Sequence, residues 1–431
     1  MSEIAANASP KSKGRLYAPW VLFVLACVSL VNYYDRNLIS ILVEPIKHDL
    51  HISDTEIGLL TGLAFAVVYS FVGVPVARLA DRFGRTRVLT SAITLWSAMT
   101  IATGMTSSFA TMALARLGVG AGEAGGLPTT HALASEYFSA NRRGTALGVI
   151  AFFAAAGVSL ALVAGGQISD RFGWRTAFYV GGAAGLAIAL LMLFTIRDAP
   201  RDVDPEAPAT SQTPSFGSAI RTLWGRRAYA HLCLGLAWGA FGSYALLTWT
   251  PAFFMRAYHM TAGQVGTSYG SVFALSSLGA VLVGGLMADM LKRWDERSPF
   301  WLLILAFGLG VPGGLMTFLV HDYKLVLLVS LPLNVVQALW VAPAYALVQN
   351  LSGSPLRATG AALFMMIVNI IGLGFGPSAV GLISDLLKPY VGSFSLGLSL
   401  IIATLTFVPA VIHFMLATRT VRKDIEAAAA T

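Results

Sequence analysis

Four ionisable side chains lie inside two strongly apolar stretches of this 431-residue chain. Asp35 and Arg36 are adjacent in the first stretch, and Arg116 and Glu123 lie together in a later one. A charge at the centre of a hydrocarbon layer costs about 3 kcal/mol or more, and such residues usually move protons, ions or substrates. On a helix, Arg116 and Glu123 share one face two turns apart, whereas Asp35 and Arg36 differ in direction by about 100°. These residues therefore predict proton transfer or anion binding within a membrane.

The elements that must hold these residues are apolar runs that recur along the chain. Hydrophobic residues make up 56% of the sequence and charged residues only 12%, compared with about 25% charged residues in a soluble domain. Each run is long enough, at about 20 residues, to cross a hydrocarbon core as a helix. The sequence therefore predicts an all-α polytopic membrane protein.

Twelve spans are predicted, in two sets of six. The first set lies near 17–43, 57–80, 87–106, 110–137, 145–168 and 176–196, and the second near 229–256, 264–290, 299–320, 325–350, 357–386 and 392–418. The resulting domains are a disordered tail (1–16), a six-helix bundle (17–196), a proline-containing linker (197–228), a second bundle (229–418) and a tail (419–431).

The basic residues indicate the orientation in the membrane. The formal net charge is +8, and most of the 29 Lys and Arg residues fall on the side that carries the N-terminus. Because cytoplasmic loops are enriched in Lys and Arg, we expect both termini to be cytoplasmic in a multi-pass protein of the cell inner membrane. Since the charges separate apolar runs, they predict a lipid bilayer as the partner and no nucleic acid.

An internal repeat relates the two halves. The predicted fifth and eleventh spans end in Gly166-Gln-Ile-Ser-Asp170 and Gly381-Leu-Ile-Ser-Asp385. The second and eighth spans end in Ala77-Arg-Leu-Ala-Asp81 and Gly285-Leu-Met-Ala-Asp289, on the other membrane face. A recurrence every three spans on alternating faces is expected when each half contains two inverted three-helix units, so the repeat predicts two bundles related by a pseudo-two-fold axis.

The loop after the second span resembles the G-x-x-x-D-R-x-G-R motif of the major facilitator superfamily. It reads Ala77-Arg-Leu-Ala-Asp81-Arg82-Phe-Gly84-Arg85, with Ala in place of the first Gly. The resemblance implies that Asp81 and Arg85 hold the cytoplasmic ends of the halves together when the cavity opens outward. Anchoring by basic residues alone is the alternative. The predicted cytoplasmic gate comprises Asp81, Arg82, Gly84, Arg85 and Asp289.

Further motifs resemble the spinster-like branch of this superfamily. They are Asn32-Tyr-Tyr-Asp35-Arg36, Glu44-Pro-Ile-Lys-His-Asp49, Gly58-Leu-Leu-Thr-Gly62-Leu-Ala-Phe65 and Gly122-Glu123-Ala-Gly125. This resemblance implies an amphipathic lipid substrate, such as a lysophospholipid or a sphingoid phosphate. The organic anion symporters related to sialin share the first and last motifs, so a proton-coupled symporter of sugar acids is the alternative.

The superfamily fold implies that the first and fourth spans line a central cavity. Asp35 would then pair with Arg116, and Glu123 would be the titrating acid. Burial in an apolar cavity favours the protonated form of a carboxyl group, which suits a proton carrier near neutral pH. Asp35, Glu123 and Arg116 are therefore the predicted proton-coupling residues, and a static ion-pair network is the alternative. Arg36 would bind an anionic headgroup or brace Asp35.

The second half contains no Asp, Glu, Lys or Arg in the middle of a predicted span. It is therefore expected to shape the substrate cavity, although Trp and Tyr more often pack or anchor at interfaces. The predicted substrate-binding residues are Arg36, Arg116, Tyr244, Trp249, Asn334, Trp340 and Asn369.

Signatures of enzymes are missing from the sequence. It contains no Walker loop, no paired metal-ligand spacing and no nucleophile elbow. We therefore expect a secondary active transporter that works by alternating access, is monomeric, and uses no cofactor or metal beyond a proton as coupling ion. A channel is the competing class, but the charges cluster in one half and do not form rings around a pore.

Overall fold

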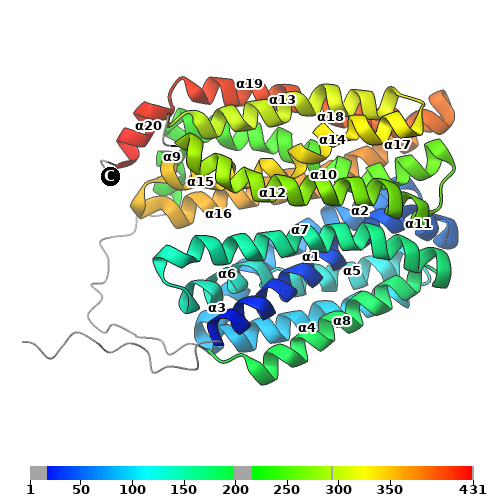
Figure 1. Cartoon of the computed structure of the whole chain (residues 1–431), viewed down its shortest axis with the longest axis horizontal. Helices are drawn as coiled ribbons and strands as arrows, with labels where there is room; N and C mark the ends of the chain where they lie inside the picture. The colour runs from blue at the N-terminus through cyan, green and yellow to red at the C-terminus, as the bar shows by residue number, and fades with distance from the viewer. Residues whose placement is uncertain (1–16, 199–215, 293–294, 430–431) are drawn as a thin grey trace, which may run out of the picture.

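The computed structural model describes residues 17–198, 216–292 and 295–429, apart from the side chains of residues 283–292 and of a few other positions. These residues form helices and short connections, with no strand among them. They are grouped in two bundles that lie side by side, as Figure 1 shows.

Six helical rods form the first bundle. Their helices are α1 (Tyr17–Leu50), α2 (Asp54–Thr61) with α3 (Leu63–Phe83), α4 (Arg85–Gly104), α5 (Phe109–Glu123) with α6 (Gly126–Tyr137), α7 (Ala140–Phe172) and α8 (Trp174–Thr195). The second and fourth rods are each broken in the middle, at Gly62 and at Ala124–Gly125.

Six further rods form the second bundle. They are α10 (Arg227–Tyr258), α11 (Ala262–Val265) with π-helix η1 (Gly266–Gly270) and α12 (Ser271–Lys292), α13 (Ser298–Leu319), α14 (Tyr323–Leu339) with α15 (Val341–Ser352), α16 (Arg357–Ile367) with π-helix η3 (Val368–Phe375) and α17 (Gly376–Val391), and α18 (Ser395–Leu405) with α19 (Phe407–Thr418). The short helices α9 (Phe216–Gly225), 3₁₀ turns η2 (Ser354–Leu356) and η4 (Gly392–Phe394), and α20 (Val421–Ala429) connect or follow them.

The prediction of a twelve-helix, all-α membrane architecture is confirmed. Within the described residues, nine stretches are long and apolar enough to cross a membrane, and one of these, Ser354–Thr418, contains two rods. The two rods outside these stretches are α4, which is rich in Ser and Thr, and the α5–α6 rod, which is interrupted by its break.

Both ends of the described chain lie at one end of the molecule, here called the terminal end (Figure 1). The Tyr17 hydroxyl donates to the Thr195 carbonyl at 3.1 Å, which ties the start of the first rod to the end of the sixth. At the opposite end, an Arg175 Nη1 donates to an Asp49 carboxylate oxygen at 2.6 Å. The rods therefore run antiparallel between two clearly separate ends.

The two bundles make close contact at the opposite end. There, α2 packs on α17 and α7 packs on α11 (Figure 1). Glycines permit this approach: a Cβ on Gly62 would lie 2.3 Å from the Gly374 carbonyl oxygen, and one on Gly58 would lie 2.8 Å from the Pro377 carbonyl oxygen. Only backbone without side chains fits at these crossings, so the opposite end is closed in this conformation.

Candidate functional site

An ion pair inside the first bundle is the centre of the candidate site. The Arg36 Nε and Nη2 atoms donate to a single carboxylate oxygen of Glu123, Oε2, at 2.8 and 2.7 Å. The Glu123 side chain is fully buried, whereas the Arg36 side chain keeps 12% of its surface exposed. A charge-assisted pair of this kind is strong and holds both side chains in place.

Aromatic rings surround the Arg36 guanidinium. Its central carbon lies 5.5 Å from the ring centre of Tyr33, 5.1 Å from that of Phe65 and 4.9 Å from that of Tyr69. Rings at these distances attract a cation through their electron-rich faces. Tyr244 of the second bundle is close enough to interact electrostatically with Arg36. The guanidinium therefore lies where the two bundles face each other.

A helix break positions Glu123. The residue is the last of α5, and the chain continues through Ala124 and Gly125 before α6 begins. Close packing holds the break, because a Cβ on Gly122 would lie 2.7 Å from the Trp96 backbone nitrogen. The carboxylate therefore lies at the end of a half-helix within the fourth rod.

The second carboxylate, Asp35, points away from Arg36 into the first bundle. Its side chain is fully buried, and neither oxygen makes a hydrogen bond. A Cβ on Gly181 of α8 would lie 2.8 Å from its Oδ1, and Thr100 of α4 lies close enough to interact with it. Asp35 is therefore enclosed by the first bundle's own helices.

The pairing expected between Asp35 and Arg116 is wrong for this conformation. Arg116 is buried with Nε and Nη1 lacking hydrogen bonds, and its guanidinium lies 5.7 Å from the Phe65 ring centre. Glu123, predicted to be the free acid, is paired with Arg36 instead. The physical reason is the 100° step between adjacent helical residues, which turns Arg36 toward Glu123 and Asp35 toward α8.

The candidate residues Tyr244, Asn334 and Asn369 of the second half lie on three different rods. Tyr244 is half-buried near Arg36, and Asn369 is buried in the π-helix η3. Asn334 is buried beside Tyr269, whose hydroxyl donates to its Oδ1 at 3.1 Å, while its Nδ2 makes no hydrogen bond.

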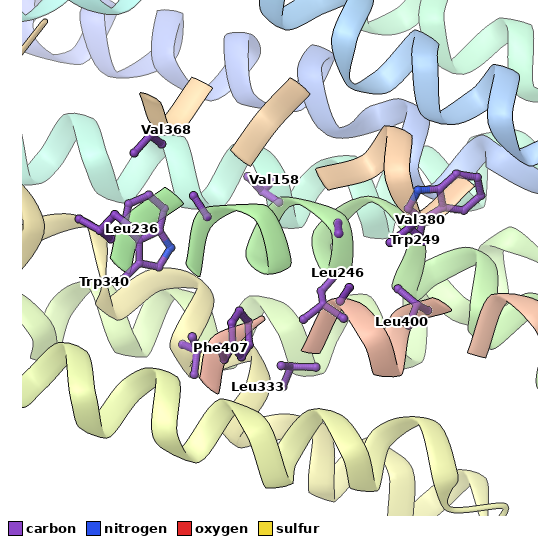
Figure 2. Close-up of a cluster of buried hydrophobic side chains, with 14 of the residues drawn as sticks. Val158, Leu236, Leu246, Trp249, Leu333, Trp340, Val368, Val380, Leu400 and Phe407 are labelled. Carbon is purple, nitrogen blue, oxygen red and sulfur yellow. The ribbon is translucent and has the colours of Figure 1, made fainter. Parts of the chain in front are cut away.

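Two tryptophans of the second half are packing residues in this conformation. The Trp249 indole N–H donates to the Pro377 carbonyl at 2.9 Å. Figure 2 shows Trp249 beside Val380 and Trp340 beside Leu236 in the buried apolar cluster. Both indoles are largely buried in this state.

The predicted cytoplasmic gate is described only in part. The side chains of Asp81 and Asp289 lie outside the described residues. Gly84 has a φ of +100°, and Arg82 lies over the Phe83 ring at 5.2 Å. The Arg85 guanidinium contacts Glu136 at 2.6 Å, within its own bundle, so this contact does not bridge the halves.

A polar network at the opposite end was not foreseen from the sequence. Two nitrogens of Arg256 donate to the Asp54 carboxylate at 2.6 and 2.8 Å, and Arg256 also contacts Glu44 at 2.6 Å. Lys47 also pairs with Asp54. The Ser384 hydroxyl donates to the Asp54 carboxylate at 2.7 Å. The sequence shows only that charged residues lie at the ends of spans. It does not show which residues pair, because the partners lie up to 330 residues apart.

Comparison with known proteins identifies the family. The profile described as Major Facilitator Superfamily matches residues 25–377. The chain belongs to this superfamily. It is therefore a polytopic membrane transporter and not an enzyme.

Individual relatives narrow this assignment. This superfamily member is 36% identical over 408 residues to an MFS-type efflux pump of Mycolicibacterium smegmatis, covering 94% of each chain. It is 26% identical to protein spinster homolog 1 of Xenopus tropicalis, covering 85% of this chain and 72% of that one.

A solved structure shows the same fold. It is that of a bacterial homologue of the human lysosomal transporter Spinster in an inward-facing, unoccupied conformation. The TM-score is 0.83 at 24% sequence identity, covering 95% of this chain and 99% of that chain. The chain therefore has the fold of this spinster homologue, and its similarity to spinster proteins agrees with the resemblance of the motifs around Asp35 and Glu123.

Proposed function

We propose that this protein is a proton-coupled, alternating-access transporter of an amphipathic molecule with an anionic headgroup, such as a lysophospholipid or a sphingoid phosphate. The observation that supports this most directly is the buried Arg36–Glu123 pair at the junction of the bundles. A cation held there by a single carboxylate can exchange its partner for a substrate anion, and intramembrane charges of this kind are usually functional.

Coupling would follow from competition for Arg36. In this structure, the Glu123 carboxylate neutralises the guanidinium and accepts hydrogen bonds from its Nε and Nη2 atoms. Protonation of Glu123 removes that negative charge, so Arg36 becomes available to a phosphate or carboxylate group. Release of the proton restores the ion pair and expels the anion. One proton and one anion would therefore use the same cation in alternation.

Asp35 and Arg116 would provide a second proton site. Both are buried and lack hydrogen bonds to one or more of their polar atoms, which is costly in an apolar interior. The energetic cost of burying these groups falls when a proton binds Asp35 or when the helices rearrange. We therefore assign Asp35 the role of a second proton carrier and Arg116 the role of adjusting the proton affinity of both acids.

The surroundings of Arg36 favour an amphipathic substrate over a small organic anion. Apart from Glu123, the side chains around the guanidinium are the rings of Tyr33, Phe65 and Tyr69, which suit hydrocarbon next to a single anionic group. A sugar acid, the alternative substrate class, would need a denser array of hydrogen-bonding groups. The efflux pump from Mycolicibacterium smegmatis supports outward movement of the substrate.

The remaining aspects of the proposal concern the environment of the protein. We place it in the bacterial inner membrane as a monomer, with the terminal end in the cytoplasm, the bilayer as its only partner besides substrate, and the proton as coupling ion without a resident cofactor. The clustering of Lys and Arg in loops at the terminal end supports this orientation.

Transport in proteoliposomes with an imposed pH gradient tests the proposal. Fluorescent lysophospholipids and radiolabelled sugar acids are supplied in parallel to the wild type and to Glu123→Gln. The proposal expects the lipid to move only with the gradient and the variant to lose that dependence. Movement of the sugar acid alone would establish the alternative, and gradient-independent movement of either substrate would refute proton coupling.

A further inference from the structure

Two Gly-x-x-x-Asp segments end the fifth and eleventh rods at the opposite end of the molecule. They are Gly166–Asp170, at the end of α7, and Gly381–Asp385, in α17. In the sequence they indicate a duplication and nothing more. In the structure each one meets the beginning of a rod from the other bundle, and the transport mechanism proposed above uses neither.

The segment in α17 binds the start of the second rod. The Asp385 carboxylate accepts hydrogen bonds from the Thr55 backbone N–H and hydroxyl, both at 2.7 Å, and from the Asp54 N–H at 3.3 Å. These N–H groups belong to the first turn of α2, which has no carbonyl partners for them within the helix. An anionic carboxylate there is also favoured by the helix dipole.

The segment in α7 binds the start of the eighth rod in a corresponding way. The hydroxyl of Thr261, the residue that caps α11, donates to the Asp170 carboxylate. The neighbouring Gln167 donates to the Gly263 carbonyl at 2.9 Å and to the Thr267 hydroxyl at 2.6 Å. The first bundle therefore binds the start of a helix in the second bundle, through Asp170. The second bundle likewise binds the start of a helix in the first bundle, through Asp385.

The glycine of each segment makes this contact possible. A Cβ on Gly166 would lie 2.3 Å from the Ala262 carbonyl oxygen, and a Cβ on Gly381 would lie 2.2 Å from the Asp54 carbonyl oxygen. Real Cβ atoms do not approach oxygen so closely, so any larger residue must push the two bundles apart. In both segments the aspartate reaches the partner rod one turn beyond the glycine, because residues four apart share a helix face.

We infer that these two segments form a reciprocal gate that closes the opposite end of the transporter. Asp170 and Asp385 bind the partner bundle's helix starts, and Gly166 and Gly381 allow the bundles to close on each other. The gate must release when the opposite end opens. The Asp54–Arg256 ion pair lies beside the contact between α2 and α17 and not beside the contact between α7 and α11. The inference rests on the superfamily's alternating access and not on proton coupling.

Distances between spin labels at the two ends test the gate. Labels at Ser107 and Tyr390, both exposed, report the opposite end, and labels at Arg142 and Arg357 report the terminal end. The native cysteines, Cys27 and Cys233, are first replaced by Ser and Ala. We expect Gly166→Ala and Gly381→Ala to make the conformation with a closed opposite end the minor one. The Ser107–Tyr390 distances should then become longer and the Arg142–Arg357 distances shorter.

Matched controls separate gating from general damage. Gly148→Ala lies in the same helix as Gly166, where an added Cβ meets nothing within 4 Å. Asp49→Asn alters a carboxylate at the same end that pairs with Arg175 inside one bundle. Both controls are expected to keep the wild-type distance distributions.

The aspartate variants decide the outcome if the alanine variants fail to fold. Asp170→Asn and Asp385→Asn keep the side-chain shape and remove the charge, so they are expected to shift the same distances in the same direction, and their combination is expected to shift them further. Monodisperse elution and an unchanged thermal midpoint establish that a variant is folded. Folded aspartate variants with wild-type distances at both ends would overturn the gate, whatever the transport assays show.

Discussion

Arg36 donates both of its hydrogen bonds to one oxygen of Glu123, Oε2, while the other oxygen, Oε1, is buried without a hydrogen-bond partner. A proton can therefore bind Oε1 without displacing any hydrogen bond. In the proposed coupling, the proton would bind Oε1 while Oε2 still contacts Arg36. This asymmetry is the starting point for the first prediction.

Glu123→Gln is expected to abolish proton-driven accumulation while substrate binding persists. The Gln amide oxygen can still accept from Arg36, but the side chain can neither bind nor release a proton. Arg36 then remains available to the anion at every pH. Accumulation in proteoliposomes with and without a pH gradient, together with substrate exchange at equilibrium, measures the effect. A variant that still accumulates substrate against a gradient would show that Glu123 only positions Arg36.

Arg36→Lys is expected to weaken binding of an anionic amphiphile by about tenfold or more. A lysine keeps the charge but loses the planar donor pair and the stacking on the Tyr33, Phe65 and Tyr69 rings, and about 1.4 kcal/mol corresponds to tenfold in affinity. Tryptophan fluorescence titration of the purified protein with a lysophospholipid measures the dissociation constant.

Arg116→Lys is the matched control for that substitution. Arg116 also lies near Phe65, but it is fully buried and its charge faces the first bundle. Its variant is expected to leave the dissociation constant within about twofold of the wild type while changing the pH dependence of transport. Equal losses of affinity in both variants would show that Arg36 has no special role in recognition.

The fold could be predicted from sequence because its signals are local. Apolar runs of the right length, the duplicated Gly-x-x-x-Asp segments and the motif at Ala77–Arg85 each need only a few neighbouring residues. They predict the twelve rods and the two bundles, and the structure and the family comparison confirm both.

The arrangement within the site could be predicted only in part. The sequence places Asp35, Arg36, Arg116 and Glu123 in two spans, but which pairs form depends on how each helix is rotated, and one residue changes the direction by about 100°. Arg256, part of the network at the opposite end, finds its partner Asp54 202 residues away. No local pattern contains that relationship.

Asp35→Asn is expected to stabilise the protein while impairing proton coupling. The carboxyl group is buried without a hydrogen bond, and the amide cannot carry the negative charge of an ionised carboxylate, whose burial without a partner is costly. Thermal unfolding in detergent should therefore show a higher midpoint, and transport under a pH gradient should fall. Asp49→Asn, at a half-exposed carboxylate paired with Arg175, should change neither. A lower midpoint for Asp35→Asn would mean that the ionised carboxylate stabilises the bundle.

Trp249→Phe is expected to lower stability without changing substrate affinity. The indole is fully buried and donates to the Pro377 carbonyl, so the substitution leaves that acceptor without its partner and opens a small cavity, together costing about 1–3 kcal/mol. Tyr244→Phe is the converse variant: Tyr244 interacts electrostatically with Arg36, and loss of its hydroxyl should weaken substrate binding with little effect on the thermal midpoint. Unfolding midpoints and fluorescence-based dissociation constants of the two variants, measured side by side, separate packing from recognition. If Trp249→Phe weakens binding while its midpoint is unchanged, Trp249 contacts substrate in another state of the cycle, as its sequence position first suggested.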